Sequence, residues 1–167
     1  MTEQTQTNDY DRRSEALWAT IDEQDEEAFR AKIEELVANL PADSAVAAFE
    51  RACALDSTGH PEQAVPLYRR ALGLGLHGER RRRAVIQLSS SLRNLDRVSE
   101  SLELLTAERG QPSDRLDDAV NAFFALSLAD SGREREAVSV ALAALAPHLP
   151  RYQRSVGSYA RLLIDEM

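Results

Sequence analysis

The chain has 167 residues, of which 43% are hydrophobic and 5% aromatic, and its net charge is −8. This length fits one domain, and the scarcity of aromatic residues means that Ala, Leu and Val must build most of its core. The acidity belongs to residues 1–50, which hold 13 acidic and 4 basic residues, whereas residues 51–167 have a net charge of +1. Because nucleic-acid-binding domains usually carry a strong basic surplus, we expect no nucleic-acid partner.

The N-terminal segment, residues 1–13, is polar and has no apolar periodicity, so we expect a disordered tail. Ser14 can then cap a short helix that carries Leu17, Trp18 and Ile21 on one edge. A second helix, with an apolar stripe from Phe29 to Leu40, completes an N-terminal helix pair at residues 14–41.

Three helical hairpins are predicted next, because apolar residues recur at three- and four-residue spacing on both sides of a turn. An amphipathic helix, residues 151–165, follows the last hairpin. No segment of useful length alternates with a period of two, so we expect no strands. The hairpins are expected at residues 43–76, 79–110 and 114–147, with turns at Gly59, Asp96 and Gly132.

The turns are 37 and 36 residues apart, and small residues recur at fixed distances from them. A fixed period of helix-turn-helix units indicates a helical solenoid. The small residues suit places where two helices cross closely, because a large side chain there would force the helices apart. They are Ala52, Ser89 and Ala125 seven residues before each turn, and Ala64, Ser101 and Ala137 five residues after it.

Over residues 43–150 this pattern resembles the tetratricopeptide repeat (TPR) family. The first hairpin fits best, with Ala52, Gly59, Ala64, Tyr68 and Ala71. The second departs from the pattern at Asp96, in place of the turn glycine, and at Glu108, in place of a late alanine. The early tryptophan of the family is replaced in the three hairpins by Ala48, Val85 and Asn121.

The resemblance implies an all-α fold, a right-handed α–α superhelix of about three TPR-like hairpins in a single domain, residues 14–167. The N-terminal helix pair, or degenerate repeat, would precede the hairpins, and residues 151–165 would form a C-terminal capping helix.

The resemblance also implies a partner groove lined by the first helix of each hairpin. Phe49, Cys53, Ile86 and Ser90 do not reproduce the Lys and Asn positions of the family's chaperone-tail carboxylate clamp, so chaperone tails are not expected there. Phe49 and Ile86 instead favour an amphipathic or extended peptide, unless some of these residues simply pack beneath the N-terminal helices. The full predicted groove is Phe49, Cys53, Asp56, Arg83, Ile86, Ser90, Arg93, Asn94, Ala122 and Leu126.

Four consecutive arginines, Arg80 to Arg83, stand at a predicted helix N-terminus, where the macrodipole disfavours positive charge. With the preceding glycines and free helix amides they could receive a carboxylate or a phosphate. Arg80, Arg82 and Arg83 are the candidate anion contacts. The simpler interpretation is a solvated face, neutralised by the acidic N-terminal region of the same or a neighbouring chain.

No motif predicts catalysis, a cofactor or a metal. The G-x-G-x-x-G sequence at residues 73–78 follows a predicted helix rather than a strand, which favours an inter-repeat turn over a dinucleotide site. The histidines His60, His77 and His148 lack partners at ligand spacing.

Cys53 is the only cysteine, which favours a reducing compartment, and the N-terminus does not resemble a signal peptide. The longest apolar run, residues 138–147, is too short to span a bilayer. We therefore expect a cytoplasmic protein without a membrane partner. Lys32 is the only lysine, a bias that a high-GC gene would produce, and we expect a bacterial protein.

These observations predict a non-enzymatic adaptor that binds a protein or peptide, acidic or amphipathic, in the concave groove. The alternative is a homo-oligomerisation module, such as a homodimer, in which the acidic N-terminal region of one chain meets the Arg80–Arg83 face of another.

Overall fold

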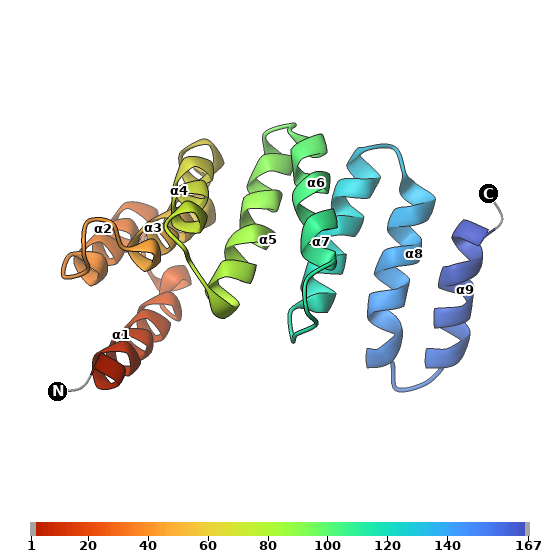
Figure 1. Cartoon of the computed structure of the whole chain (residues 1–167), viewed down its shortest axis with the longest axis horizontal. Helices are drawn as coiled ribbons and strands as arrows, with labels where there is room; N and C mark the ends of the chain where they lie inside the picture. The colour runs from red at the N-terminus through yellow and green to blue at the C-terminus, as the bar shows by residue number, and fades with distance from the viewer. Residues whose placement is uncertain (1–2, 166–167) are drawn as a thin grey trace. The chain divides into compact units, whose positions relative to one another are not determined.

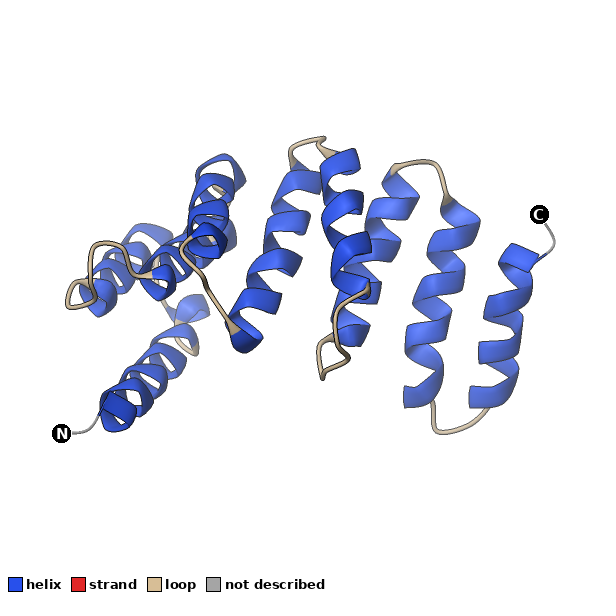
Figure 2. Cartoon of the chain, viewed as in Figure 1, coloured by secondary structure: helices blue, strands red, loops and turns tan. Residues whose placement is uncertain are grey.

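The computed structural model describes residues 3–165, and it describes side chains from Asp9 onward. Within this range the chain is helical and contains no strand, as Figures 1 and 2 show. The predicted all-α helical repeat fold is therefore confirmed. The helices are α1 (Glu3–Trp18), α2 (Glu26–Val37), α3 (Ala45–Ser57), α4 (Pro61–Gly73), α5 (Gly78–Asn94), α6 (Val98–Arg109), α7 (Asp117–Asp130), α8 (Glu134–Leu145) and α9 (Gln153–Asp165), with short 3-10 helices at Ile21–Glu23 and Ala146–His148.

The chain divides into two compact units, Met1–Leu76 and His77–Met167, called unit 1 and unit 2 below. The sequence predicted a single domain for residues 14–167. The boundary falls in the glycine-rich segment, residues 73–78, where α4 ends at Gly73 and Gly75 has a φ of 84°. Glycine adopts this left-handed conformation without a Cβ clash, and three glycines in six residues leave few side chains for packing.

Helix α1 begins at Glu3, so the disordered tail expected for residues 1–13 is wrong from that residue on; residues 1–2 lie outside the described range. The prediction overlooked Tyr10, which packs with Leu17 against a core that includes Phe29. Tyr10 lies seven residues before Leu17 and so on the same helix face. This apolar face accounts for a helix in a segment that otherwise looks polar.

A buried carboxylate ties α1 to α3 in unit 1. Glu50 accepts hydrogen bonds from Ser14 Oγ at 3.1 Å and from Trp18 Nε1 at 2.8 Å. Ser14 was expected to cap a helix, but it is buried in the interior of α1. The two donors satisfy a carboxylate whose burial would otherwise be costly.

The three predicted turns share one backbone geometry. Gly59, Asp96 and Gly132 have φ values of 78°, 59° and 78°, all left-handed. In each turn the next residue donates its backbone N–H to a leucine carbonyl, an arrangement typical of helix C-termini. These bonds join His60 to Leu55, Arg97 to Leu92 and Arg133 to Leu128, each at 2.9 Å.

Unit 2 contains α5 to α9, and its helices follow one another as hairpins (Figure 1). Helix α5 also packs against α7, so the first helices of two successive hairpins are neighbours. Ser101, one of the small residues of the repeat, lies where α6 of the second hairpin meets α7 of the third: its hydroxyl and that of Ser127 are 2.8 Å apart and buried. Helix α9 packs on α8, where Ser139 Oγ donates to the Ala160 carbonyl at 2.7 Å.

Candidate functional site

The arginine run meets Glu108, a departure from the repeat pattern, inside unit 2. Arg81 donates through both terminal nitrogens to the Glu108 carboxylate, at 2.8 and 2.9 Å. Glu108 is only 2% exposed, although alanines hold its place in the other repeats. A carboxylate can be buried there because the bidentate guanidinium satisfies both oxygens.

Arg82 is the most buried arginine among the described residues, at 4% exposure. It donates to the Pro112 carbonyl at 3.0 Å and to Asp117 Oδ1 at 2.6 Å, and its Nε lies 3.3 Å from Asp114 Oδ1. Through these contacts Arg82 holds the connection between α6 and α7, residues 110–116, against α5. Its guanidinium is occupied by groups of its own unit.

The arginine run thus has two parts in the structure. Arg81 and Arg82 are neutralised by Glu108, Asp114 and Asp117. Of the other two, Arg80 is half-buried and Arg83 is exposed. The neutralising carboxylates come from unit 2 itself, whereas the sequence had suggested the acidic N-terminal region. Sequence reasoning missed these pairs because Arg81 and Glu108 are 27 residues apart.

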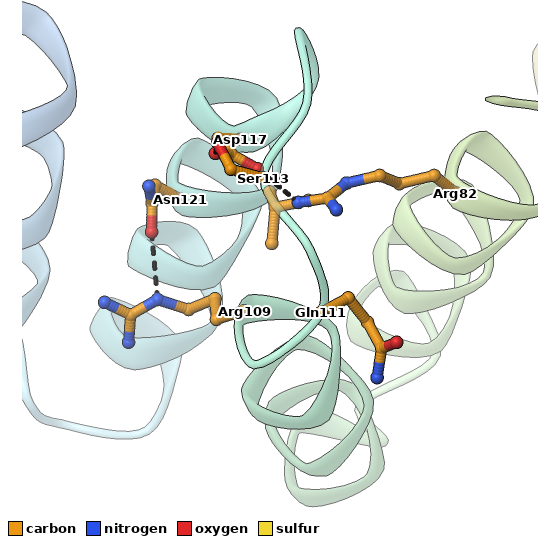
Figure 3. Close-up of a pocket in the computed structure, with 7 residues that line it drawn as sticks. Arg82, Arg109, Gln111, Ser113, Asp117 and Asn121 are labelled. Atoms are coloured by element: carbon orange, nitrogen blue, oxygen red, sulfur yellow. Dashed lines mark hydrogen bonds and ion pairs between the residues drawn. The ribbon is translucent and has the colours of Figure 1, made fainter.

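Two cavities flank the α6–α7 connection within unit 2. One has a volume of about 730 Å³ and opens beside Arg81, Arg115 and Glu79. The other has a volume of about 300 Å³ and is shown in Figure 3. The lining of this smaller cavity comes from α5, α6, α7 and the connection, and consists of Arg82, Arg109, Gln111, Ser113, Asp117, Val120 and Asn121.

Arg109 extends from the end of α6 to α7 along the wall of the smaller cavity (Figure 3). Its Nε donates to Asn121 Oδ1 at 2.9 Å, and its Cζ lies 4.5 Å from the centroid of the Phe124 ring. No described carboxylate pairs with this guanidinium. Stacking on an aromatic face and one directed hydrogen bond together fix its orientation.

Asp117 closes the opposite wall of the smaller cavity. The hydrogen bond from the Ser113 hydroxyl, then that from the Asp114 backbone, and the nearby Arg82 charge lower the pKa of Asp117 below its ordinary value. Each of these interactions favours the ionised carboxylate. Asp117 is therefore negatively charged at neutral pH.

The predicted groove residues range from buried to exposed. Phe49, Cys53 and Ile86 are buried, and Asp56 is half-buried and accepts a hydrogen bond from Tyr68 at 3.3 Å. Burial raises the pKa of Tyr68 far above its usual range, so the phenol stays neutral and donates.

The remaining groove residues all lie on α5 and α7 in unit 2. Arg93 is half-buried and pairs with Asp130 of α7 at 2.9 Å, and Ser90 is half-buried. The exposed members, which a partner could reach without a change in the fold, are Arg83, Asn94, Ala122 and Leu126.

Large exposed apolar side chains gather in unit 2. Among the described residues only Leu74 of unit 1 belongs to this class. Of these, sequence reasoning had placed only Leu126 on a partner surface, because periodicity marks the apolar face of a helix but does not show whether another element covers it. The members in unit 2 are Leu126, Val138, Leu145, Tyr152, Tyr159, Leu162 and Ile164.

No helix in the described part of the chain combines the length and the apolar character needed to cross a membrane.

Comparison with known proteins agrees with the repeat geometry. The profile of the tetratricopeptide repeat family matches residues 45–163. A crystal structure of a variant of a Podospora anserina protein, assigned as a kinesin light chain with nearly identical TPR-like repeats, is similar with a TM-score of 0.67. The sequences are 17% identical over 99% of this chain and 94% of that one, so this likeness concerns the fold alone. No curated protein matches the sequence. Because the family profile covers well over half of its length, the chain belongs to the tetratricopeptide repeat family.

Proposed function

We propose that the chain is a non-enzymatic adaptor that binds a partner protein or peptide on unit 2, through the exposed face of α5 and α7 that carries Leu126. Tetratricopeptide repeats generally mediate protein–protein interaction. The observation that carries the proposal is the exposure of Leu126, which leaves 46% of a large apolar side chain in solvent on the first helix of a hairpin.

The surroundings of Leu126 support this assignment. Ala122 lies one turn earlier on α7 and is exposed, which leaves room for a partner side chain. Helix α5 packs alongside α7 and adds the exposed polar groups of Arg83 and Asn94. An apolar centre with a polar rim is the usual anatomy of a protein interface.

The same place in the next repeat unit is also apolar. Leu162 follows Leu126 by 36 residues, the distance between the starts of α7 and α9, and it is exposed. Tyr159 lies one turn before Leu162 and is 65% exposed. Apolar side chains repeated at one register position suit an extended or amphipathic peptide.

Site-specific photo-crosslinking tests the proposal. A photoreactive amino acid replaces Leu126 in the full chain, which is expressed and irradiated in its native cells. The matched control replaces Val138, which is 48% exposed but lies on α8, the second helix of the hairpin. We expect an adduct of defined mass from position 126 and none of that mass from position 138. The same adduct from both positions, or no adduct from 126, would contradict the proposal.

A further inference from the structure

Helix α9 is covered on one side only. It packs on α8 and on the 3-10 helix at residues 146–148, and no other described helix packs extensively against it (Figure 1). Tyr159 is consequently 65% exposed. The residue 36 positions earlier in the chain, Phe123 of α7, is partly buried against the core of unit 2. An aromatic side chain that the preceding repeat covers is therefore open to solvent on α9.

The exposed side of α9 carries a narrow seam, which consists of Ser155, Tyr159 and Leu162 and is called the α9 seam below. All three residues are exposed, and they follow one another at spacings of four and three residues, which places them on one line along the helix. An alternation of three and four is the spacing by which two helices pack along a shared line. Tyr152, just before α9, is 74% exposed and lies three residues before Ser155. The α9 seam therefore has the spacing of a surface that receives a second helix.

Two charged residues beside the α9 seam stand at the ends of the helix where its macrodipole disfavours them. Arg154 lies in the first turn of α9 and Asp165 is its last residue, whereas the macrodipole favours acidic residues in the first turn and basic residues in the last. Both side chains are exposed, and neither forms a hydrogen bond or an ion pair with another described residue. They are eleven residues, or about three turns, apart and so lie on the same side of α9. The helix itself gives no reason for this placement.

An antiparallel copy of α9 complements both the seam and the charges. The first turn of one helix then lies beside the last turn of the other, so Arg154 of each copy meets Asp165 of the other. The seam is matched in the same register, because the large Tyr159 of each copy lies opposite the small Ser155 of the other. A parallel pair would instead place like charges side by side. We infer that α9 binds α9 of a second copy of this chain, as an antiparallel pair related by a two-fold axis.

The size of this surface predicts a reversible dimer. Each copy contributes Tyr152 and Tyr159, and a buried aromatic side chain covers about 150–250 Å². The area buried by two copies is therefore near the lower limit of specific interfaces, about 1,200 Å². Leu126 of α7 is not part of the α9 seam, so the inference goes beyond the proposed function. Tyr159 and Leu162 also continue the apolar row of that partner surface, so dimerisation competes with a partner long enough to reach α9.

Analytical ultracentrifugation of the full chain tests the inference. Sedimentation velocity is measured at physiological ionic strength over protein concentrations up to about 1 mM, and we expect a monomer–dimer equilibrium. Tyr159→Glu should raise the dissociation constant of the dimer at least about thirtyfold. Leu74→Glu places the same charge on an apolar residue of unit 1 that is 40% exposed, and it should leave the constant unchanged. A monomer over the whole range, or an equal effect of the two variants, would overturn the inference.

Charge reversal tests the antiparallel arrangement. Arg154→Asp and Asp165→Arg each bring two pairs of like charges together, so each variant alone should dimerise at least about tenfold more weakly. An equimolar mixture of the two should form a heterodimer about as tightly as the natural protein, because both pairs are then of opposite charge again. Each substitution also suits the macrodipole of α9, so unfolding of the helix does not account for a loss. Single variants that dimerise normally, or a mixture that stays monomeric, would overturn the inference and leave the proposal for the Leu126 surface standing.

Discussion

At the scale of single residues, the second hairpin shows how a buried charge can replace a small apolar residue. Glu108 stands where the other repeats have Ala71 and Ala144, and it is tolerated because Arg81 satisfies both of its oxygens. The sequence revealed the departure but not its partner, since helical periodicity carries no information on contacts between residues of different helices. The pair is therefore a stability element and not an exposed anion site.

Replacement of Glu108 by alanine restores the residue of the other repeats and yet should destabilise unit 2. Arg81 and the nearby Arg82 would lose a buried partner, at a cost of about 2 kcal/mol. Chemical denaturation of the full chain, followed by circular dichroism, measures the change. The double variant Arg81→Met, Glu108→Ala should recover part of the loss, because Arg81 is then no longer left without its carboxylate. An unchanged midpoint for the single variant would contradict the role of the pair.

Asp117 gives the α6–α7 connection a pH dependence. Its folded-state pKa is lowered, chiefly by the Ser113 hydroxyl, so its contribution to stability is present above the unfolded pKa of about 3.9. The contribution is lost as the pH falls through the folded-state value. Asp117→Asn should therefore lower the denaturation midpoint at pH 7, and the difference from the natural protein should shrink as the pH falls below the unfolded pKa and vanish below the folded-state pKa. A difference that persists at low pH would contradict this origin.

At the scale of elements, the three hairpins followed from the sequence with small errors at their ends. Each combines a 3.6-residue apolar period with a residue that tolerates a left-handed turn, and these are local properties. Helix α1 did not follow, because its apolar face depends on Tyr10, which stands alone in a polar segment. The division at residues 76 and 77 also escaped prediction, since it depends on packing between elements.

The turns predict opposite effects of two substitutions. Asp96 adopts a φ of 59° that glycine occupies without strain, so Asp96→Gly should stabilise the chain by up to about 1 kcal/mol. Gly132 has a φ of 78° with open space where a Cβ would lie, so Gly132→Ala should destabilise it by about 1 kcal/mol through conformation alone. Thermal denaturation of both variants checks the signs. If both variants change the stability in the same direction, the two turns are not equivalent.

At the scale of the whole molecule, the two units differ in what they expose. The groove residues predicted in unit 1, Phe49 and Cys53, are buried, whereas those at Ala122 and Leu126 in unit 2 are exposed. The family resemblance identified the helices that could form a groove, but only burial separates the residues that a partner can reach. The proposal therefore places partner binding on unit 2.

The affinity of the crosslinked partner, measured by calorimetry, tests this assignment most directly. Leu126→Glu should weaken binding at least about thirtyfold, as expected for the centre of an interface. Val138→Glu introduces the same charge at a similarly exposed residue of α8 and should bind like the natural protein. Unchanged affinity in Leu126→Glu, or an equal loss in both variants, would contradict the assignment of partner binding to this face of unit 2.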